Sequence, residues 1–421
     1  MHFELRCCRC DEGRVEHGAY QCPSCGGRLE VVYPDLTGCF EEVFGQGRSG
    51  GNGIWRFRRL LPLTENTPVV TLGEGGTPLH ECSGLRDQLG IARLVIKNET
   101  LNPSGTFKDR CAAIAVAKAL EFGASAAVLA SAGNAGASAA AYAARAGLSL
   151  FVFIPKHTPR ERITQILLYG ATAIATGASV NEAVALIDQV RDRLGWHVLT
   201  TAAAYNPYQG EGPKTIGYEM AEQLEFRLPD WVIVPVGGGG ILSALWKSFK
   251  EMRQAGVTER LPRMVGVQAA GCAPLVRAYD EGIAADAIPS WGTVTTLAAS
   301  IADPFPIDGE TALTAIRESG GTAVAIEDSE ILQAQIDLAR HEGIFAEPAS
   351  CSTLAALRRL LMGGAIQRAQ TVALIATGVG FKDMTSAEKA APPALEIDCN
   401  VGALERAIGA PSTPRKKTTP S

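Results

Sequence analysis

The feature that most constrains this fold is the alternation of short, uninterrupted apolar runs with longer segments of helical periodicity. Apolar runs at residues 127–130, 149–154 and 231–236 predict strands, while 135–146 and 182–194 have the periodicity of helices. Strands that are apolar on both faces occur in parallel sheets covered by helices on both sides. The sequence therefore predicts an α/β fold with mainly parallel sheets.

Composition limits the classes of protein to which this sequence can belong. Its 421 residues allow roughly three structural units of about 150 residues each. The net charge of −5 argues against a nucleic-acid-binding protein, and 46% hydrophobic residues argue against a disordered chain. The first residues lack the apolar core of a signal peptide, and Gly133 and Gly136 interrupt the uncharged run 122–144. We therefore expect a cytoplasmic protein without a membrane span.

Five of the 11 cysteines lie within the first 25 residues. Cys7 and Cys10 form one C-x-x-C pair, and Cys22 and Cys25 form another. Two such pairs can place four thiolates tetrahedrally around a structural zinc. The 11-residue spacer is shorter than the roughly 15–20 residues usual between such pairs, and unligated, reduced thiols are the alternative. Residues 46–52, rich in Gly, predict a linker to the rest of the chain.

The segment 102–110 (Asn-Pro-Ser-Gly-Thr-Phe-Lys-Asp-Arg) contains the most informative lysine of the sequence. Its proline and glycine predict a turn, and we expect a helix to begin near Thr106. Lys108 then lies in a first helical turn, where the positive end of the helix dipole favours the neutral amine. An amine of this kind can form a Schiff base, although surface lysines at helix starts are also common.

Two glycine-containing turns each follow a predicted strand and precede a predicted helix. The first comprises Ser131, Ala132, Gly133 and Asn134. Its backbone N–H groups would face a small anion such as a carboxylate. The second comprises Gly237, Gly238, Gly239, Gly240 and Ile241. This second turn could bind a phosphate at a helix N-terminus, but its sequence is not that of a P-loop or of a dinucleotide-binding motif. For each of the two segments, the alternative is a tight turn without a ligand.

Several motifs together resemble the threonine synthases, which belong to the fold type II enzymes that use pyridoxal phosphate (PLP). The resemblance extends from about residue 53 to residue 383. Its motifs lie at 53–57, 72–79, 97–99, 102–110, 343–350 and 377–383. The last of them, Thr-Gly-Val-Gly-Phe-Lys-Asp, best separates threonine synthases from the serine/threonine dehydratases. An N-terminal segment like a zinc ribbon also occurs in some threonine synthases.

The resemblance implies two three-layer α/β domains with mainly parallel sheets, preceded by a small zinc-ribbon-like segment at residues 1–36. The larger, PLP-binding domain would comprise residues 53–95 and 200–400. A smaller, mobile α/β domain would comprise residues 96–199. We expect the tail at 401–421 to be disordered towards its end, because it is rich in Pro, Lys and Thr.

The resemblance also implies roles for individual residues in the cofactor site. Lys108 would hold PLP as a Schiff base, Phe107 would pack against the cofactor ring, and Asn134 would hydrogen-bond its phenolic oxygen. The turn 237–241 would cradle the cofactor phosphate, and Thr377 would face the pyridine nitrogen. The implied substrate-binding residues are Ser131, Ala132, Gly133 and Lys214.

The implied reaction converts O-phosphohomoserine and water to threonine and phosphate, with Lys108 moving protons at Cα and Cβ. Three positions depart from the family pattern, because Ala135, Ala185 and Gln209 stand where polar or cationic residues are expected near the substrate phosphate. Four basic residues are candidates to supply the lost charge: Lys156, Arg160, Arg162 and Lys214.

Two other functions stay open at this point. Another fold type II lyase or β-replacement enzyme, such as a serine/threonine dehydratase, would account for the altered residues. A non-catalytic zinc-ribbon protein that keeps the fold is disfavoured by the presence of Lys108, Asn134 and Thr377. In each enzymatic case the resemblance implies a small amino-acid substrate and a homodimer, with no nucleic-acid or membrane partner.

Overall fold

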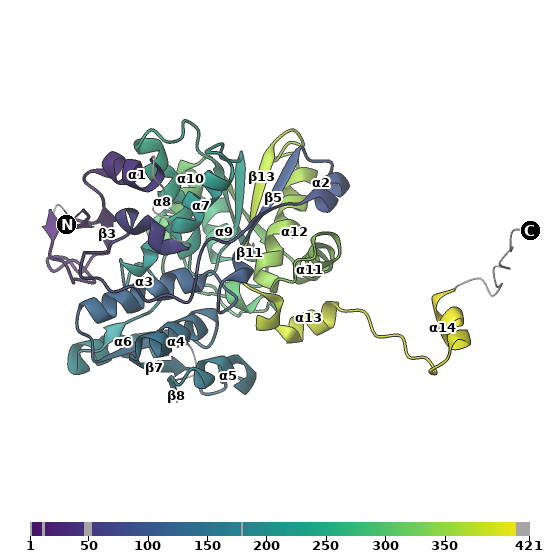
Figure 1. The fold of residues 1–421 in the computed structure, drawn as a ribbon, viewed down its shortest axis with the longest axis horizontal. Coiled ribbons are helices and arrows are strands. Elements are labelled where there is room, and N and C mark those ends of the chain that lie inside the picture. Colours follow the sequence, from purple (N-terminus) through teal and green to yellow (C-terminus); the bar gives the residue numbers. More distant parts are fainter. Residues whose placement is uncertain (1, 11–12, 46–52, 178–179, 410–421) are drawn as a thin grey trace, which may run out of the picture.

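The computed structural model describes residues 2–10, 13–45, 53–177 and 180–409 (Figure 1). The expected linker and the last part of the expected tail lie outside the described residues, as does the side chain of Ala185. Among the described residues, no helix combines the length and the apolar character needed to cross a membrane.

The described residues form three sheets, and the first is small. It is antiparallel with the strand order β2-β1-β3, made of β1 (Glu4–Cys7), β2 (Arg14–Val15) and β3 (Leu29–Val32). The α1 helix (Leu36–Phe44) follows it, and the side chain of Asp35 caps the helix by accepting from the backbone N–H of Gly38. The N-terminal segment therefore has a sheet of its own.

The largest sheet has six strands in the order β12-β11-β10-β13-β5-β4, and all its neighbours are parallel except β4 and β5. Its strands are β4 (Leu79–Glu81), β5 (Arg93–Asn98), β10 (Trp231–Pro235), β11 (Arg263–Ala269), β12 (Thr322–Ile326) and β13 (Thr371–Ala376). The sequence-based domain boundary at residue 96 falls inside β5.

Helices cover both faces of this sheet (Figure 1). They are α2 (Ser83–Leu89), α7 (Lys214–Gln223), α8 (Gly240–Gln254), α9 (Pro274–Asp280), α10 (Gly309–Glu318), α11 (Asp328–Glu342) and α12 (Pro348–Met362). Along β10, Val232 and Val234 pack into the cluster that contains α8 and α10, while Ile233 packs into the cluster that contains α2, α11 and α12. This explains why β10 is apolar at every position.

The third sheet has four parallel strands in the order β8-β7-β6-β9. Its strands are β6 (Ala126–Ala130), β7 (Ser149–Ile154), β8 (Thr172–Ala175) and β9 (His197–Val198). Its helices are α3 (Lys108–Glu121), α4 (Asn134–Ala146), α5 (Arg160–Leu168) and α6 (Val180–Leu194). On β6, Leu129 belongs to the cluster with α3 and α4, and Val128 to the cluster with α6, so this sheet is also covered on both faces.

Shorter elements connect the sheets and end the described chain. The 3-10 turns are η1 (Ile54–Leu60), η2 (Glu99–Leu101), η3 (Gln209–Glu211), η4 (Ala285–Ala287), η5 (Ala299–Ile301) and η6 (Gly380–Lys382). The last helices are α13 (Met384–Ala390) and α14 (Val401–Ile408), which lies within the predicted tail. The side chain of Asn400 caps α14, which accounts for a helix there.

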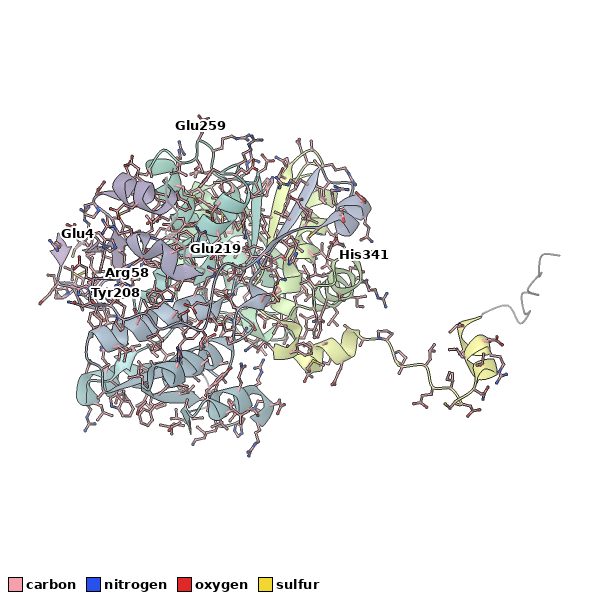
Figure 2. All side chains as sticks on the ribbon, viewed as in Figure 1. Glu4, Arg58, Tyr208, Glu219, Glu259 and His341 are labelled. Atoms are coloured by element: carbon pink, nitrogen blue, oxygen red, sulfur yellow. The ribbon has the colours of Figure 1, made fainter. Side chains whose placement is uncertain are left out.

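A buried ionic network ties α3 and α7 to β5. Arg110 Nε lies 2.7 Å from Glu99 Oε2, and Arg110 Nη1 lies 2.7 Å from Glu219 Oε1. Lys97 Nζ lies 2.7 Å from the other oxygen of Glu219. Burial alone raises the pKa of Glu219, but Arg110 and Lys97 hold it well below its usual value. Glu219 (Figure 2) is therefore a structural carboxylate at the junction of these elements.

Candidate active site

A cavity of about 510 Å³ opens at the carboxyl ends of β10 and β13 and is also lined by residues of the four-stranded sheet. Parallel α/β sheets bind ligands at this edge of their strands. Among its lining residues are all those predicted from the sequence for the cofactor and substrate except Lys214. They are Phe107, Lys108, Ser131, Ala132, Gly133, Asn134, Gly237, Gly238, Gly239, Gly240, Ile241 and Thr377.

Lys108 is held at the cavity by the turn that precedes α3. Gly105 has φ of +83°, and a Cβ atom there would lie 2.7 Å from the Cγ1 atom of Val379, so the turn requires glycine. The backbone N–H of Phe107 donates to the carbonyl oxygen of Thr377 at 3.0 Å. Lys108 Nζ then lies 3.3 Å from the hydroxyl oxygen of Thr201 and 4.8 Å from the ring centroid of Phe107. The end of β13 thereby fixes the position of the lysine.

The glycine-rich turn leads from β10 directly into α8. Gly239 has φ of +99°, and a Cβ atom there would lie 2.6 Å from the carbonyl oxygen of Asp308. A Cβ atom on Gly237 would approach the carbonyl oxygen of Ser300 to 2.9 Å. The first N–H groups of a helix have no acceptor within the helix, and the helix dipole is positive there. The turn can therefore bind a phosphate without a cationic side chain.

Asn134 faces a buried carboxylate that we did not predict as a site residue. Its Nδ2 atom lies 3.2 Å and 3.1 Å from the two oxygens of Glu347, the residue before α12. Ser300 donates to Glu347 from the other side at 3.0 Å. Burial raises the pKa of Glu347. The sequence contained one signal for it, since Glu347 lies in the motif 343–350.

Thr377 follows β13 and lies 3.1 Å from the hydroxyl oxygen of Ser350. The hydroxyl of Ser350 also accepts hydrogen bonds from the backbone N–H groups of Thr377 and Gly378, at 2.9 Å and 3.0 Å. Both side chains are buried. The start of α12 thus orients a neutral hydroxyl pair at the wall of the cavity.

One of the four candidate cations, Arg162, lines the cavity, and so do three carboxylates that we did not predict: Asp303, Asp308 and Glu347. Arg162, on α5, is exposed and lines the cavity. The half-buried carboxyl of Asp303 lies on the segment between η5 and α10, and burial raises its pKa to about 6. Of the four candidate cations, Arg162 is the one that lines this cavity.

The structure gives Lys214 a different position from the expected one. Its side chain is fully buried, and its Nζ atom lies 2.6 Å from Glu211 Oε2 and 2.9 Å from Glu251 Oε2. It also lies over the ring of Tyr33, 4.3 Å from the centroid. Two buried carboxylates therefore neutralise Lys214, and Lys214 is not among the residues that line the cavity.

Two of the departures from the family pattern are visible in the structure. Ala135 is buried and lines the cavity. Gln209 is buried and turns its amide towards the backbone, where Nε2 donates to the carbonyl oxygens of Thr200 and Ala202. Gln209 thus holds the loop that contains Thr201 and is not among the residues that line the cavity.

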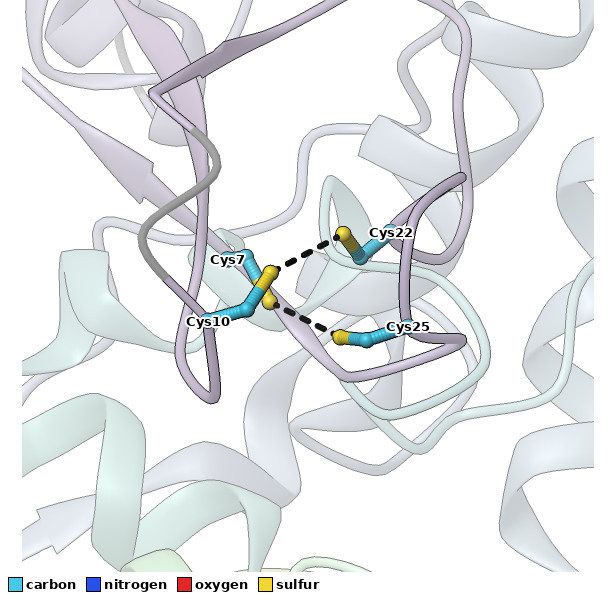
Figure 3. A group of neighbouring side chains, drawn as sticks. All are labelled: Cys7, Cys10, Cys22 and Cys25. Atoms are coloured by element: carbon cyan, nitrogen blue, oxygen red, sulfur yellow. Dashed lines mark hydrogen bonds between the residues drawn. The ribbon is translucent and has the colours of Figure 1, made fainter.

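The four cysteines of the two C-x-x-C pairs converge in the N-terminal segment (Figure 3). Their sulfur atoms all lie within 4.8 Å of one another. Cys7 and Cys25 are 3.5 Å apart, and Cys10 and Cys22 are 3.6 Å apart. Four thiolates at about 2.3 Å from a tetrahedral zinc would be separated by roughly 3.8 Å. The backbone N–H of Arg9 donates to the Cys7 sulfur at 3.3 Å. Together with further hydrogen bonds, that from the backbone of Cys10 foremost, it lowers the pKa of the Cys7 thiol to about 6.

Solved structures with the same fold include several enzymes that act on amino acids. The processed threonine deaminase isoform 2 of Solanum lycopersicum is 23% identical, with a TM-score of 0.63 over 75% of this chain and 86% of that one. A fungal L-serine ammonia-lyase from Rhizomucor miehei is 19% identical, with a TM-score of 0.62 over 75% of this chain and 96% of that one. These similarities confirm the predicted fold type II architecture.

Comparisons of the sequence identify the family. A family model described as "Pyridoxal-phosphate dependent enzyme" matches residues 70–378. The threonine synthase of Methanocaldococcus jannaschii is 39% identical over 96% of this chain and 98% of its own length. That of Methanosarcina acetivorans is 38% identical over the same shares, and that of Synechocystis sp. is 39% identical over 78% and 83%. The chain therefore belongs to the pyridoxal-phosphate-dependent enzymes and, among them, to the threonine synthase family.

Proposed function

We propose that this PLP-dependent lyase converts O-phosphohomoserine and water to threonine and phosphate at the cavity around Lys108. The observation that carries this proposal is that one cavity joins a lysine amine, a backbone anion site at α8 and a separate cation, Arg162. The substrate has an amine, a carboxylate and a phosphate, so it needs groups at more than one side of the cofactor. Membership of the threonine synthase family supports the same reaction.

The residues of the cavity fit PLP. The turn 237–240 at the start of α8 suits the cofactor phosphate, because its glycines leave the backbone N–H groups accessible to an anion. Lys108 supplies the amine that holds the cofactor, and Thr377 supplies a neutral hydroxyl for the pyridine nitrogen. In addition, the buried hydroxyl of Thr200 lines the cavity and has no hydrogen-bond partner among the described residues. When bound, PLP would withdraw electrons from the bonds at the substrate Cα.

The protein's own groups would then position the substrate and move protons. Lys108 Nζ, next to the hydroxyl of Thr201, is the amine placed to take and return protons at Cα and Cβ. Asn134 is held by Glu347, so its amide keeps one orientation towards the cavity. Thr377 and Phe107 are buried at the wall of the cavity, so bulk water has little access there and Lys108 would be the main proton carrier, with one water molecule entering as the second substrate.

The substrate phosphate would be bound by other lining residues of the cavity than the cofactor phosphate. The backbone N–H groups of 131–134 lie at the start of α4, where the helix dipole favours an anion. Arg162 supplies the cation for which the sequence offered four candidates. Lys214 has no part in this proposal, because Glu211 and Glu251 neutralise it.

A serine/threonine dehydratase-like reaction is the second candidate, and Ala135 favours it. Ala135 lines the cavity at a position where the family pattern has a polar residue, so a phosphorylated substrate would have one polar contact fewer there. The two functions are separated by measuring phosphate release from O-phosphohomoserine beside 2-oxoacid release from serine and threonine. We expect phosphate release to dominate. Deamination of threonine or serine without phosphate release would replace the synthase proposal by the dehydratase.

The Lys108→Ala variant is the control for both assays. It should lose the visible absorbance of the bound cofactor and all turnover. Among the described residues, Lys108 is the one lysine that lines this cavity, so no other amine there could hold the cofactor. A variant that keeps the absorbance band and turnover would show that another lysine holds PLP.

The four clustered cysteines would bind one structural zinc. Their sulfur separations fit a tetrahedral ion, and the cytoplasmic location that we propose keeps such thiols reduced. The enzyme would act as a homodimer.

A further inference from the structure

A second cavity, of about 190 Å³, adjoins the cavity that fits the cofactor and the substrate. We call the second one the rear cavity and the first one the front cavity. The two cavities share six lining residues: Phe107, Lys108, Thr201, Gly240, Ile241 and Asp308. Lys108 therefore lies at the boundary between the two cavities.

The rear cavity leads from Lys108 towards the surface of the protein. Three of its lining residues are exposed: Glu30, Lys250 and Glu318. Residues 28–31 of the N-terminal segment form one part of its wall, and α8 and α10 form another. Lys247 on α8 joins these parts, since its Nζ atom donates to the carbonyl oxygen of Val31 at 2.5 Å. Solvent thus has a way to Lys108 that does not pass through the front cavity.

Two buried side chains of the rear cavity can accept hydrogen bonds from water. Gln209 donates through Nε2 to two backbone carbonyl oxygens of the loop 200–204, and its Oε1 atom has no hydrogen-bond partner among the described residues. Asp308 accepts from the backbone N–H groups of Ala203 and Ala204, at 3.0 Å and 3.3 Å. A carboxylate has about four acceptor positions, so Asp308 keeps some for other donors. Buried water commonly satisfies acceptors of this kind.

The size of the rear cavity also suits water. One buried water molecule needs about 10–15 Å³ of such space and two to four polar partners, so the cavity has room for several. At its inner end, the hydroxyl oxygen of Thr201 lies 3.3 Å from Lys108 Nζ. A hydroxyl both donates and accepts, so Thr201 can hydrogen-bond a water molecule beside the amine.

We propose that the rear cavity supplies the water molecule that the reaction consumes and delivers it beside Lys108. This inference rests on the proposed synthase function. While the substrate is bound, the amino acid and its phosphate would fill the front cavity up to Arg162. Water that enters from the rear would not have to pass the substrate or the leaving phosphate.

The delivered water would take part in one balanced step. Loss of phosphate leaves the substrate unsaturated between Cα and Cβ. The oxygen of water then forms a bond to Cβ while one of its O–H bonds breaks. The proton passes to Lys108 Nζ, which returns one proton to Cα. The product is threonine, and the step needs no oxidant or reductant.

Two outcomes compete once phosphate has left. Addition of water at Cβ gives threonine, whereas release of the unsaturated amino acid leads, with one water molecule from solution, to 2-oxobutyrate and ammonia. A narrower rear cavity should slow only the addition of water. The amount of 2-oxobutyrate formed per phosphate released therefore measures the supply of water separately from the rate of phosphate release.

Two substitutions narrow the rear cavity without touching the front cavity. Ala244 on α8 lines the rear cavity only, and Thr314 on α10 is a half-buried residue of the same lining. In Ala244→Leu and in Thr314→Phe, we expect the 2-oxobutyrate per phosphate to rise about tenfold, because a ratio of competing rates responds directly when one of them falls. The KM for O-phosphohomoserine should stay near that of the wild type. Ala144→Leu, at an exposed residue of α4 that lines neither cavity, is the matched control and should leave the ratio unchanged.

Cofactor absorbance and far-ultraviolet circular dichroism would verify that each variant is loaded and folded. A wild type that forms threonine, together with an unchanged product ratio in both narrowed variants, would overturn the rear path and leave the proposed function intact. A rise in KM with an unchanged ratio would also overturn it, because the substitutions would then act on substrate binding. A wild type that releases no phosphate from O-phosphohomoserine would instead overturn the proposed function and this inference with it.

Discussion

Replacing Arg162 by Ala tests the substrate-phosphate site most directly. Arg162 lines the cavity from α5 and is exposed at its edge. A hydrogen bond to a charged group contributes about 1.5–3 kcal/mol, and exposure to solvent reduces such a contribution. We therefore take about 1.4 kcal/mol, which corresponds to a roughly tenfold rise in KM for O-phosphohomoserine. The value of kcat should change little, because the phosphate is bound in the ground state and the transition state alike until it leaves.

The assay is steady-state phosphate release at several salt concentrations. The KM of the wild type should rise with ionic strength, and that of Arg162→Ala should rise less, because screening acts on the charge that the variant lacks. Arg160→Ala is the matched control, since Arg160 is exposed on the same helix but is not among the residues that line the cavity. Equal effects of the two substitutions, or a fall in kcat without a change in KM, would refute the assignment of Arg162.

Lys214→Ala should behave in the opposite way. Removing Lys214 leaves the buried carboxylates of Glu211 and Glu251 without their cation, and breaking a buried pair in this way costs about 3–5 kcal/mol. We expect a large fall in the melting temperature. In protein that still folds, the KM for O-phosphohomoserine should stay near that of the wild type. A selective rise in KM at unchanged stability would return Lys214 to the substrate site.

Two further predictions concern the N-terminal segment and its contact with the body. Purified enzyme should contain about one zinc per chain. The Cys22→Ser variant should lose the zinc and have a lower melting temperature, whereas Cys8→Ser should change neither. Wild-type protein that contains no zinc after purification without chelator would contradict this prediction. His197 is buried and contacts Tyr20. Burial and the nearby Lys118 lower the pKa of His197 to about 3. Below pH 6.5 this histidine therefore binds a proton in the unfolded chain but not in the folded chain. The free energy of unfolding should therefore fall by about 1.6 kcal/mol between pH 6.5 and pH 5 through this residue. A His197→Gln variant with the same pH dependence as the wild type would contradict the assignment.

The sequence predicted the parts of the site that are local in the chain. The turn before Lys108 and the four-glycine turn each contain, within ten residues, the strand end, the glycines and the helix start that determine their shape. Such turns can be interpreted from sequence because only a few backbone conformations satisfy them. The structure accordingly brings Lys108 and 237–241 to one cavity.

The parts that the sequence left undetermined depend on contacts between distant segments. Glu347 meets Asn134 across more than 200 residues, and Asp303 reaches the cavity from an irregular segment with no motif of its own. Lys214 has a position that fits the family motif, but its carboxylate partner Glu251 comes from another helix, α8. A motif gives the residue type, whereas the charge of its neighbours decides whether the residue is available to a ligand.

The distribution of charge in the cavity explains why Arg162 is important for binding the substrate phosphate. The cofactor phosphate can be bound by the N–H groups at the start of α8, so it needs no cation of its own. Asp303, Asp308 and Glu347 add acidic groups to the same cavity, although burial raises the pKa of all three and so weakens their repulsion of an anion. The substrate phosphate must therefore be attracted by the start of α4 and by Arg162. Among the described residues, Arg162 and Lys108 are the cations that line the cavity. If Arg162 does not bind the substrate phosphate, this cavity favours an unphosphorylated hydroxy amino acid, and the dehydratase reaction would become the better proposal.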